Sequence, residues 1–186
     1  RAVCLLTDLP PSTTESAPGS DSTVLHLSQE AVSLLSGAID ALGDRFAIAG
    51  FASNTRHEVR YLHVKGFSEP WGEVPKARIA AMKGDLSTRM GAVLRHGGQY
   101  LARQTEEKKI LLLLSDGEPH DVDEADPRYL IEDTKKAVGE LLSEGVHTHC
   151  VTLDAHADDY VADIFGRGYT VIDHVERLPE RLPQLF

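Results

Sequence analysis

The feature that most constrains the fold is an unbroken apolar run over residues 110–114 that ends in Ser115, Asp116 and Gly117. An apolar run this short fits a strand buried on both faces of a parallel sheet better than a helix, because helices usually need about ten residues and a polar side. We therefore expect a central strand over residues 109–114. Asp116 would then lie at the carboxyl edge of the sheet, where open α/β folds bind their ligands.

A second apolar run near the start of the chain has the same design. Residues 2–7 are followed by Asp8 and then by a loop rich in Ser, Thr, Pro and Gly. If the two strands are neighbours, Asp8 and Asp116 would lie roughly 5 to 10 Å apart, because adjacent strands are about 4.8 Å apart. Two carboxylates with hydroxyls beside them suit a hard divalent cation.

The hydrophobic periodicity along the rest of the chain predicts alternating helices and strands. Apolar residues at helical spacing predict long helices, and shorter apolar or alternating runs predict strands. The predicted helices cover residues 23–42, 77–82, 84–104, 128–144, 158–165 and 178–185, and the further strands cover 45–51, 57–64, 146–153 and 169–172. In the helix over 84–104 we expect Ala92, Val93, Leu94, Tyr100 and Leu101 to face inward.

This element order predicts a doubly wound α/β fold with helices on both faces of a mainly parallel, six-stranded sheet. The strand over 57–64 alternates polar and apolar residues, which indicates an edge strand paired antiparallel to the strand before it. The expected strand order is 3-2-1-4-5-6, a Rossmann-like order. Strands one and four would then be adjacent at the switch point, and Asp8 and Asp116 would both lie there.

The charge of the chain limits its partners. The net charge is -10 and the pI is near 5.3, which argues against a nucleic-acid or anionic-membrane surface, because such surfaces need clustered Lys and Arg. The sequence has neither a long apolar stretch nor the start of a signal peptide, so we expect no membrane contact and a cytoplasmic location.

Length and cysteine use indicate one domain. The 186 residues suffice for a single domain over 1–186 with a real core. Because residue 1 is Arg, we expect this domain to be the C-terminal fragment of a longer protein. Cys4 and Cys150 fall in strands separated by another strand, too far apart for a disulfide, so we expect two buried thiols.

Three predicted loops should meet at the switch point. They contain Asp8 and Ser12, Thr88 with the preceding Ser87, and Asp116. Asp, Ser, Thr and Asp side chains, completed by waters, make an all-oxygen octahedral shell that Mg²⁺ accepts, with one position open for a ligand from a partner.

This set resembles the metal-ion-dependent adhesion site (MIDAS) of the von Willebrand factor A (VWA) family, in which the first loop reads Asp-x-Ser-x-Ser. The matching positions are Asp8, Pro10, Ser12, Thr88 and Asp116. The resemblance implies that Asp8, Ser12, Thr88 and Asp116 bind Mg²⁺, or Mn²⁺ or Ca²⁺. Pro10 departs from the family pattern and has no side-chain oxygen, so we expect the metal to bind weakly. In the alternative without metal, Asp8 and Thr88 cap helices and Asp116 accepts hydrogen bonds from loop amides.

Other segments resemble the C-terminal domain of the CbbO and NorD proteins, namely residues 88–96, 115–119, 129–134, 150–154, 159–160 and 165–168. That resemblance implies a non-catalytic adaptor that grips a client protein while a MoxR-type AAA+ ATPase, CbbQ-like in the first case, supplies force. The client implied by CbbO is inhibited Rubisco, and the one implied by NorD is nitric oxide reductase. The sequence of residues 88–91 is more similar to CbbO. Rubisco activation is therefore the main expectation, and the NorD-like role is the alternative.

Two other functions are alternatives to the adaptor role. A haloacid dehalogenase-like hydrolase needs a second Asp where Pro10 stands, and no glycine-rich phosphate loop is present, so hydrolysis and nucleotide binding are disfavoured. The sequence leaves open the alternative of an extracellular VWA adhesion module.

Several other polar residues suggest no chemistry of their own. The acidic residues 120–126 fit a solvated loop, because the EF-hand pattern is incomplete. The nine histidines lack zinc-site spacing, and Asp154 and His156 fit a loop. Arg89 and Arg95 fit either an acidic partner or a solvated helix face.

Overall fold

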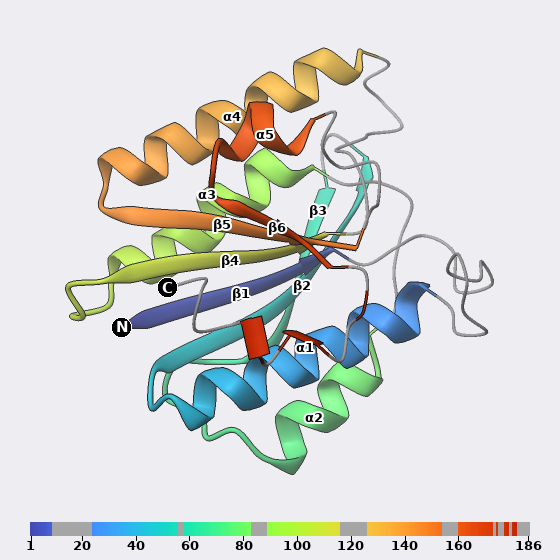
Figure 1. The fold of residues 1–186 in the computed structure, drawn as a ribbon, viewed down its shortest axis with the longest axis vertical. Coiled ribbons are helices and arrows are strands. Elements are labelled where there is room, and N and C mark those ends of the chain that lie inside the picture. Colours follow the sequence, from blue (N-terminus) through green and yellow to red (C-terminus); the bar gives the residue numbers. More distant parts are fainter. Residues whose placement is uncertain are drawn as a thin grey trace.

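The computed structural model describes residues 1–8, 24–55, 58–82, 89–115, 126–153, 160–172, 174, 177–178 and 180–181. These form a six-stranded sheet of order β3-β2-β1-β4-β5-β6 with helices on both faces (Figure 1). The strands are β1 (Ala2–Asp8), β2 (Arg45–Thr55), β3 (Glu58–Lys65), β4 (Lys109–Ser115), β5 (Val146–Thr152) and β6 (Tyr169–Val171). The helices are α1 (Val24–Ala41), α2 (Glu73–Ala80), α3 (Met90–Ala102), α4 (Pro127–Ser143) and α5 (Val161–Phe165).

The predicted fold class and strand order are confirmed. β1 pairs in parallel with β2 on one side and with β4 on the other, β5 and β6 continue in parallel, and β3 is antiparallel to β2. All seven residues of β1 are buried, and so are residues 110–115 of β4. Continuous apolar runs therefore became the central strands because both of their faces are covered.

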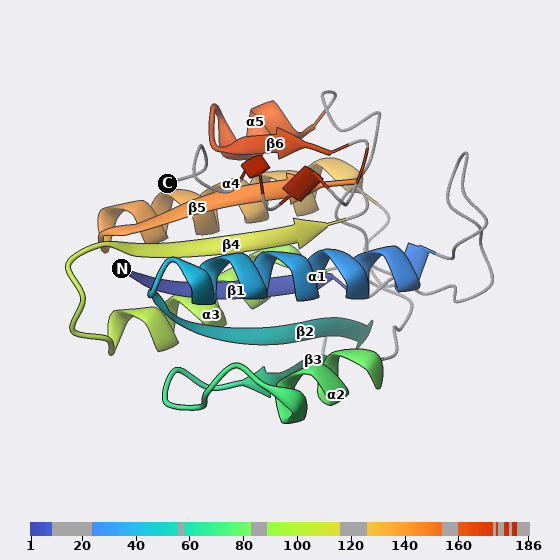
Figure 2. The same ribbon diagram turned by 60° about the horizontal axis from the view of Figure 1, so that its bottom comes forward.

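The helices divide the core into two clusters, one on each face of the sheet (Figure 2). α1 and α2 cover the face that includes Val3, Leu5 and Leu112. The opposite face, which includes Cys4, Leu6 and Leu113, is covered by α3, α4 and α5. Successive residues of a strand point to opposite faces, so one run of apolar residues supplies both clusters.

Several element boundaries differ from those predicted. β2 continues to Thr55, beyond the predicted end at Phe51, because its pairing with β3 extends to that residue. α2 starts at Glu73 rather than at residue 77 and contains Pro75, which a helix tolerates in its first turn where the missing N–H has no helical partner. α3 is described only from Met90, and its N-cap position is Arg89.

The predicted inner face of α3 was partly wrong. Ala92 is exposed and Tyr100 is 41% exposed, whereas Met90, Gly97 and Gly98 are buried together with the correctly predicted Val93, Leu94 and Leu101. The reason is that glycines were not counted as interior residues. At Gly97 a Cβ atom would lie 2.9 Å from Leu6 Cδ1, and at Gly98 a Cβ atom would overlap Leu141. The glycines thus allow α3 to approach both the sheet and α4.

Both cysteines are free and buried, as predicted. Cys4 in β1 and Cys150 in β5 are separated by β4. Burial raises the pKa of the Cys4 thiol to about 12, against a smaller lowering by its contact with Tyr61. Burial also raises the pKa of Cys150, and the nearby Asp8 carboxylate adds to the rise.

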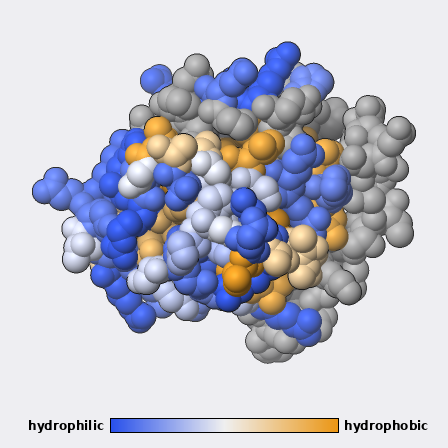
Figure 3. Space-filling model, turned by 90° about the horizontal axis from the view of Figure 1, so that it is seen from below, coloured by the Kyte–Doolittle hydropathy of each residue, from blue (hydrophilic) through white to orange (hydrophobic). Residues whose placement is uncertain are grey.

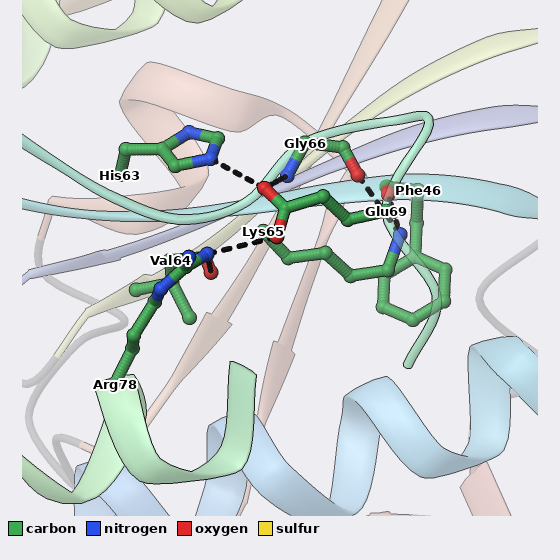
Figure 4. A network of polar contacts seen from close by, with 7 residues as sticks. All are labelled: Phe46, His63, Val64, Lys65, Gly66, Glu69 and Arg78. Atoms are coloured by element: carbon green, nitrogen blue, oxygen red, sulfur yellow. Dashed lines mark hydrogen bonds and ion pairs between the residues drawn. The ribbon is translucent and has the colours of Figure 1, made fainter. Parts of the chain in front are cut away.

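The corner between β3 and α2 is held by a polar network (Figure 4). The buried Lys65 donates from Nζ to the carbonyl oxygens of Phe46 (2.5 Å) and Gly66 (3.0 Å). Glu69 accepts from Gly66 N at 3.0 Å and from Arg78 Nη1 at 2.9 Å, and it contacts His63 Nε2 at 2.8 Å. These hydrogen bonds, that of His63 first, lower the pKa of Glu69 to about 2. The network ties the edge strand to the helix that follows it.

The two edges of the sheet are short or irregular. β6 has three residues, and the pairing of β3 with β2 shifts register between Ile48 and Ala49 and again between Ser53 and Thr55. Figure 3 views the face that carries α1 and α2, where apolar residues appear as separate patches among hydrophilic ones. In the part of the chain that the structure describes, no helix is both long and apolar enough to cross a membrane.

Candidate functional site

The site predicted at the switch point includes one described residue, Asp8. It is the last residue of β1 and its exposed fraction is 3%. β1 lies between β2 and β4, so the predicted adjacency of strands one and four is confirmed. Asp8 therefore stands at the carboxyl edge of the sheet, beside the end of β4 that leads toward Asp116.

Buried hydroxyls end β4, which neighbours β1, and β5, the strand beyond it. Ser115 ends β4 and is 2% exposed, and Thr152 ends β5, is fully buried and pairs with Ser115. By strand alternation all three side chains belong to the face covered by α3 and α4. Carboxylate and hydroxyl oxygens are donors that Mg²⁺ and Ca²⁺ accept. Asp8, the one described member of the predicted ligand set, and the two hydroxyls thus have the donor type that suits a hard divalent cation.

The other predicted ligands, Ser12, Thr88 and Asp116, lie outside the described residues, as does Pro10. Asp154 and His156 lie outside them as well. Among the described residues, no group of three or more His, Cys, Asp or Glu side chains is placed to hold a metal ion. The predicted gathering of all four ligands stays a prediction.

One residue of the acidic stretch 120–126 is described, and its role is structural. Asp126 is the N-cap of α4, and its Oδ1 accepts a hydrogen bond from Arg128 N at 3.0 Å. Such a cap satisfies a backbone donor that the helix leaves without a partner. The other residues of the stretch, 120–125, lie outside the described residues, so the expected solvated loop stays a prediction.

Arg95 links α3 to α4. The sequence analysis offered an acidic partner or a solvated helix face for this residue, and neither interpretation included this link. Its Nη1 lies 3.0 Å from Asp133 Oδ1, and its Nε lies 2.9 Å from Glu140 Oε2. One turn earlier, a Cβ atom at Gly91 would overlap the Asp133 carboxylate. α3 follows the loop with Thr88, and α4 follows the loop with Asp116. The two helices behind the predicted metal loops are therefore fixed to each other.

An aromatic cluster on β3 and α3 was missed at the sequence level. The rings of Tyr61 and Tyr100 stack with centroids 5.8 Å apart, and His96 lies edge-on to Tyr61 at 4.5 Å and to Tyr100 at 5.2 Å. Tyr61 Oη also contacts the buried Cys4 Sγ at 3.9 Å. The available signal was the four-residue spacing of His96 and Tyr100 on one helix, next to an edge strand with an aromatic residue.

Comparison with protein families assigns most of the chain to a known domain type. The model of the von Willebrand factor type A domain matches residues 19–170. This range covers most of the chain, from before α1 into β6, and leaves out β1.

Comparison with curated proteins gives relatives that match all or most of the chain. Protein NorD of Brucella melitensis biotype 1 is 42% identical over 186 residues, which are 100% of this chain and 29% of that protein. Protein NorD of Stutzerimonas stutzeri is 38% identical over 172 residues, which are 92% of this chain and 28% of that protein. The chain thus spans less than a third of the length of these relatives.

Solved structures show the same fold at low sequence identity. The PilB minor pilin from Streptococcus sanguinis superposes with a TM-score of 0.77 at 12% identity, covering 99% of this chain and 60% of that one. A von Willebrand factor type A protein from Catenulispora acidiphila superposes with a TM-score of 0.61 at 18% identity, covering 99% and 41%. The strand order, the family match and the shared sequence agree: this chain belongs to the von Willebrand factor type A family, and along its whole length it is a relative of NorD proteins.

Proposed function

We propose that this domain is a non-catalytic adaptor module that grips a client protein in a NorD-like system, where a MoxR-type AAA+ ATPase supplies the force that matures nitric oxide reductase. The observation that carries the proposal is the 42% identity to a NorD protein over all 186 residues. The ATPase and the client are partners of the whole protein, of which this chain would be one domain. The proposal includes a cytoplasmic location, where such an ATPase would act.

The NorD-like role replaces Rubisco activation as the main proposal. The sequence of residues 88–91 favoured a CbbO-like protein, but the two relatives reported above are NorD proteins. Identity near 40% along the whole chain outweighs a four-residue motif, because a short motif can match by chance. Rubisco is kept as the comparison client in the experiments.

The proposed metal ligands are Asp8, Ser12, Thr88 and Asp116. Support comes from the buried Asp8 at the carboxyl edge, the adjacency of β1 and β4, and the hydroxyl side chains that end β4 and β5. A bound Mg²⁺ would supply positive charge and one open coordination position for a carboxylate of the client. Water would stand where Pro10 lacks an oxygen, so Mg²⁺ affinity should be low.

The metal proposal is tested by calorimetric titration of the domain with Mg²⁺ and with Mn²⁺. Asp8→Asn is the first variant, because it keeps the shape of a buried side chain while removing its charge, and Asp116→Ala is the second. Circular dichroism checks that both variants fold. We expect saturable heat from the unsubstituted domain and none from the variants. Equal heats from all three proteins would contradict the metal site while leaving the fold intact.

The client proposal is tested by a pull-down with the tagged chain in Mg²⁺ buffer. Purified nitric oxide reductase subunits and Rubisco are offered in separate reactions, each with and without EDTA. We expect the reductase to be retained, Asp116→Ala to abolish retention, and EDTA to do the same. Retention of Rubisco alone would favour the CbbO-like role, and equal retention of both would argue against either assignment.

A further inference from the structure

We draw no further inference here: the strongest candidate, the surface hollow between β3 and α3 that is lined by Tyr61, Ala92, Val93 and His96, carries none because nothing in the part of the chain that the structure describes shows what covers it.

Discussion

α1 and α3 flank β1 from opposite sides and pack on it in different ways. α1 fills the space with aliphatic side chains, among them the fully buried Leu35 and Ile39. α3 instead brings its backbone close, because Gly97 faces Leu6 and Gly98 faces Leu141 with no room for a Cβ atom. A Cβ atom at Gly37 of α1 would have no neighbour within 4 Å. Of these two helices, α3 is therefore the one whose position tolerates less change.

The largest expected effect is on the reaction rate of the two cysteine thiols, which both lie on the face of the sheet covered by α3. We expect the native protein at pH 8 to react with Ellman's reagent at least about a thousandfold more slowly than the urea-unfolded chain, because only thiolates attack and burial raises the pKa of Cys4 to about 12. The reaction is followed by absorbance, with the unfolded chain as control. Fast reaction of either thiol would show that the α3 face opens readily.

The next effect compares the same glycine substitution in α3 and in α1. Gly97→Leu should destabilise the fold by about 3 kcal/mol, because Leu6 and Leu111 already occupy the space. Gly37→Leu should stabilise it by about 0.5 to 1 kcal/mol through helix propensity. Urea unfolding of both variants measures the difference. Similar free energies of unfolding would remove the contrast on which the comparison stands.

A smaller effect concerns the link between α3 and α4. Arg95→Gln should cost about 1 kcal/mol, because its two ion pairs are about one-third exposed and therefore screened by solvent. Arg103→Gln, an exposed position after the same helix, is the matched control and should change stability little. Thermal unfolding at low and high salt checks the result. A cost that is independent of salt would point to packing rather than to charge.

The smallest effect is expected on the α2 side of the sheet, at Glu69. Its folded pKa of about 2 lies below its usual 4.5, so the stabilisation is fully present above pH 4.5 and is lost as the pH falls toward 2. The stability gap between the unsubstituted protein and Glu69→Gln should therefore narrow over that range. Urea unfolding at several pH values measures the gap. A constant gap would mean that the carboxylate makes no ionised contact.

Much of this fold could be predicted because buried parallel strands leave a plain signal. Uninterrupted apolar runs located β1 and β4, and Gly43 and Gly145 at positive φ ended α1 and α4 where expected. The inner face of α3 was harder, because a glycine becomes an interior residue only when another element approaches it. Arg95 likewise gained its role from Asp133, a residue 38 positions away, which no local pattern reveals.

The site could be predicted only in part. Asp8 was found because it ends an apolar strand, and the sheet order placed it at the switch point. The aromatic cluster was missed because it needs Tyr61 from the edge strand and His96 from a helix, and the sequence alone does not say that these elements meet. Composition and periodicity describe each element, whereas a site depends on how elements come together.

The irregular borders of the sheet have a consequence for how other chains can attach. β3 shifts register twice against β2 and holds Lys65 inward, and β6 is only three residues long. Neither border offers a long, straight ladder of backbone groups for a foreign strand to copy. A partner would therefore attach through the loops and helix surfaces rather than by adding a strand to the sheet.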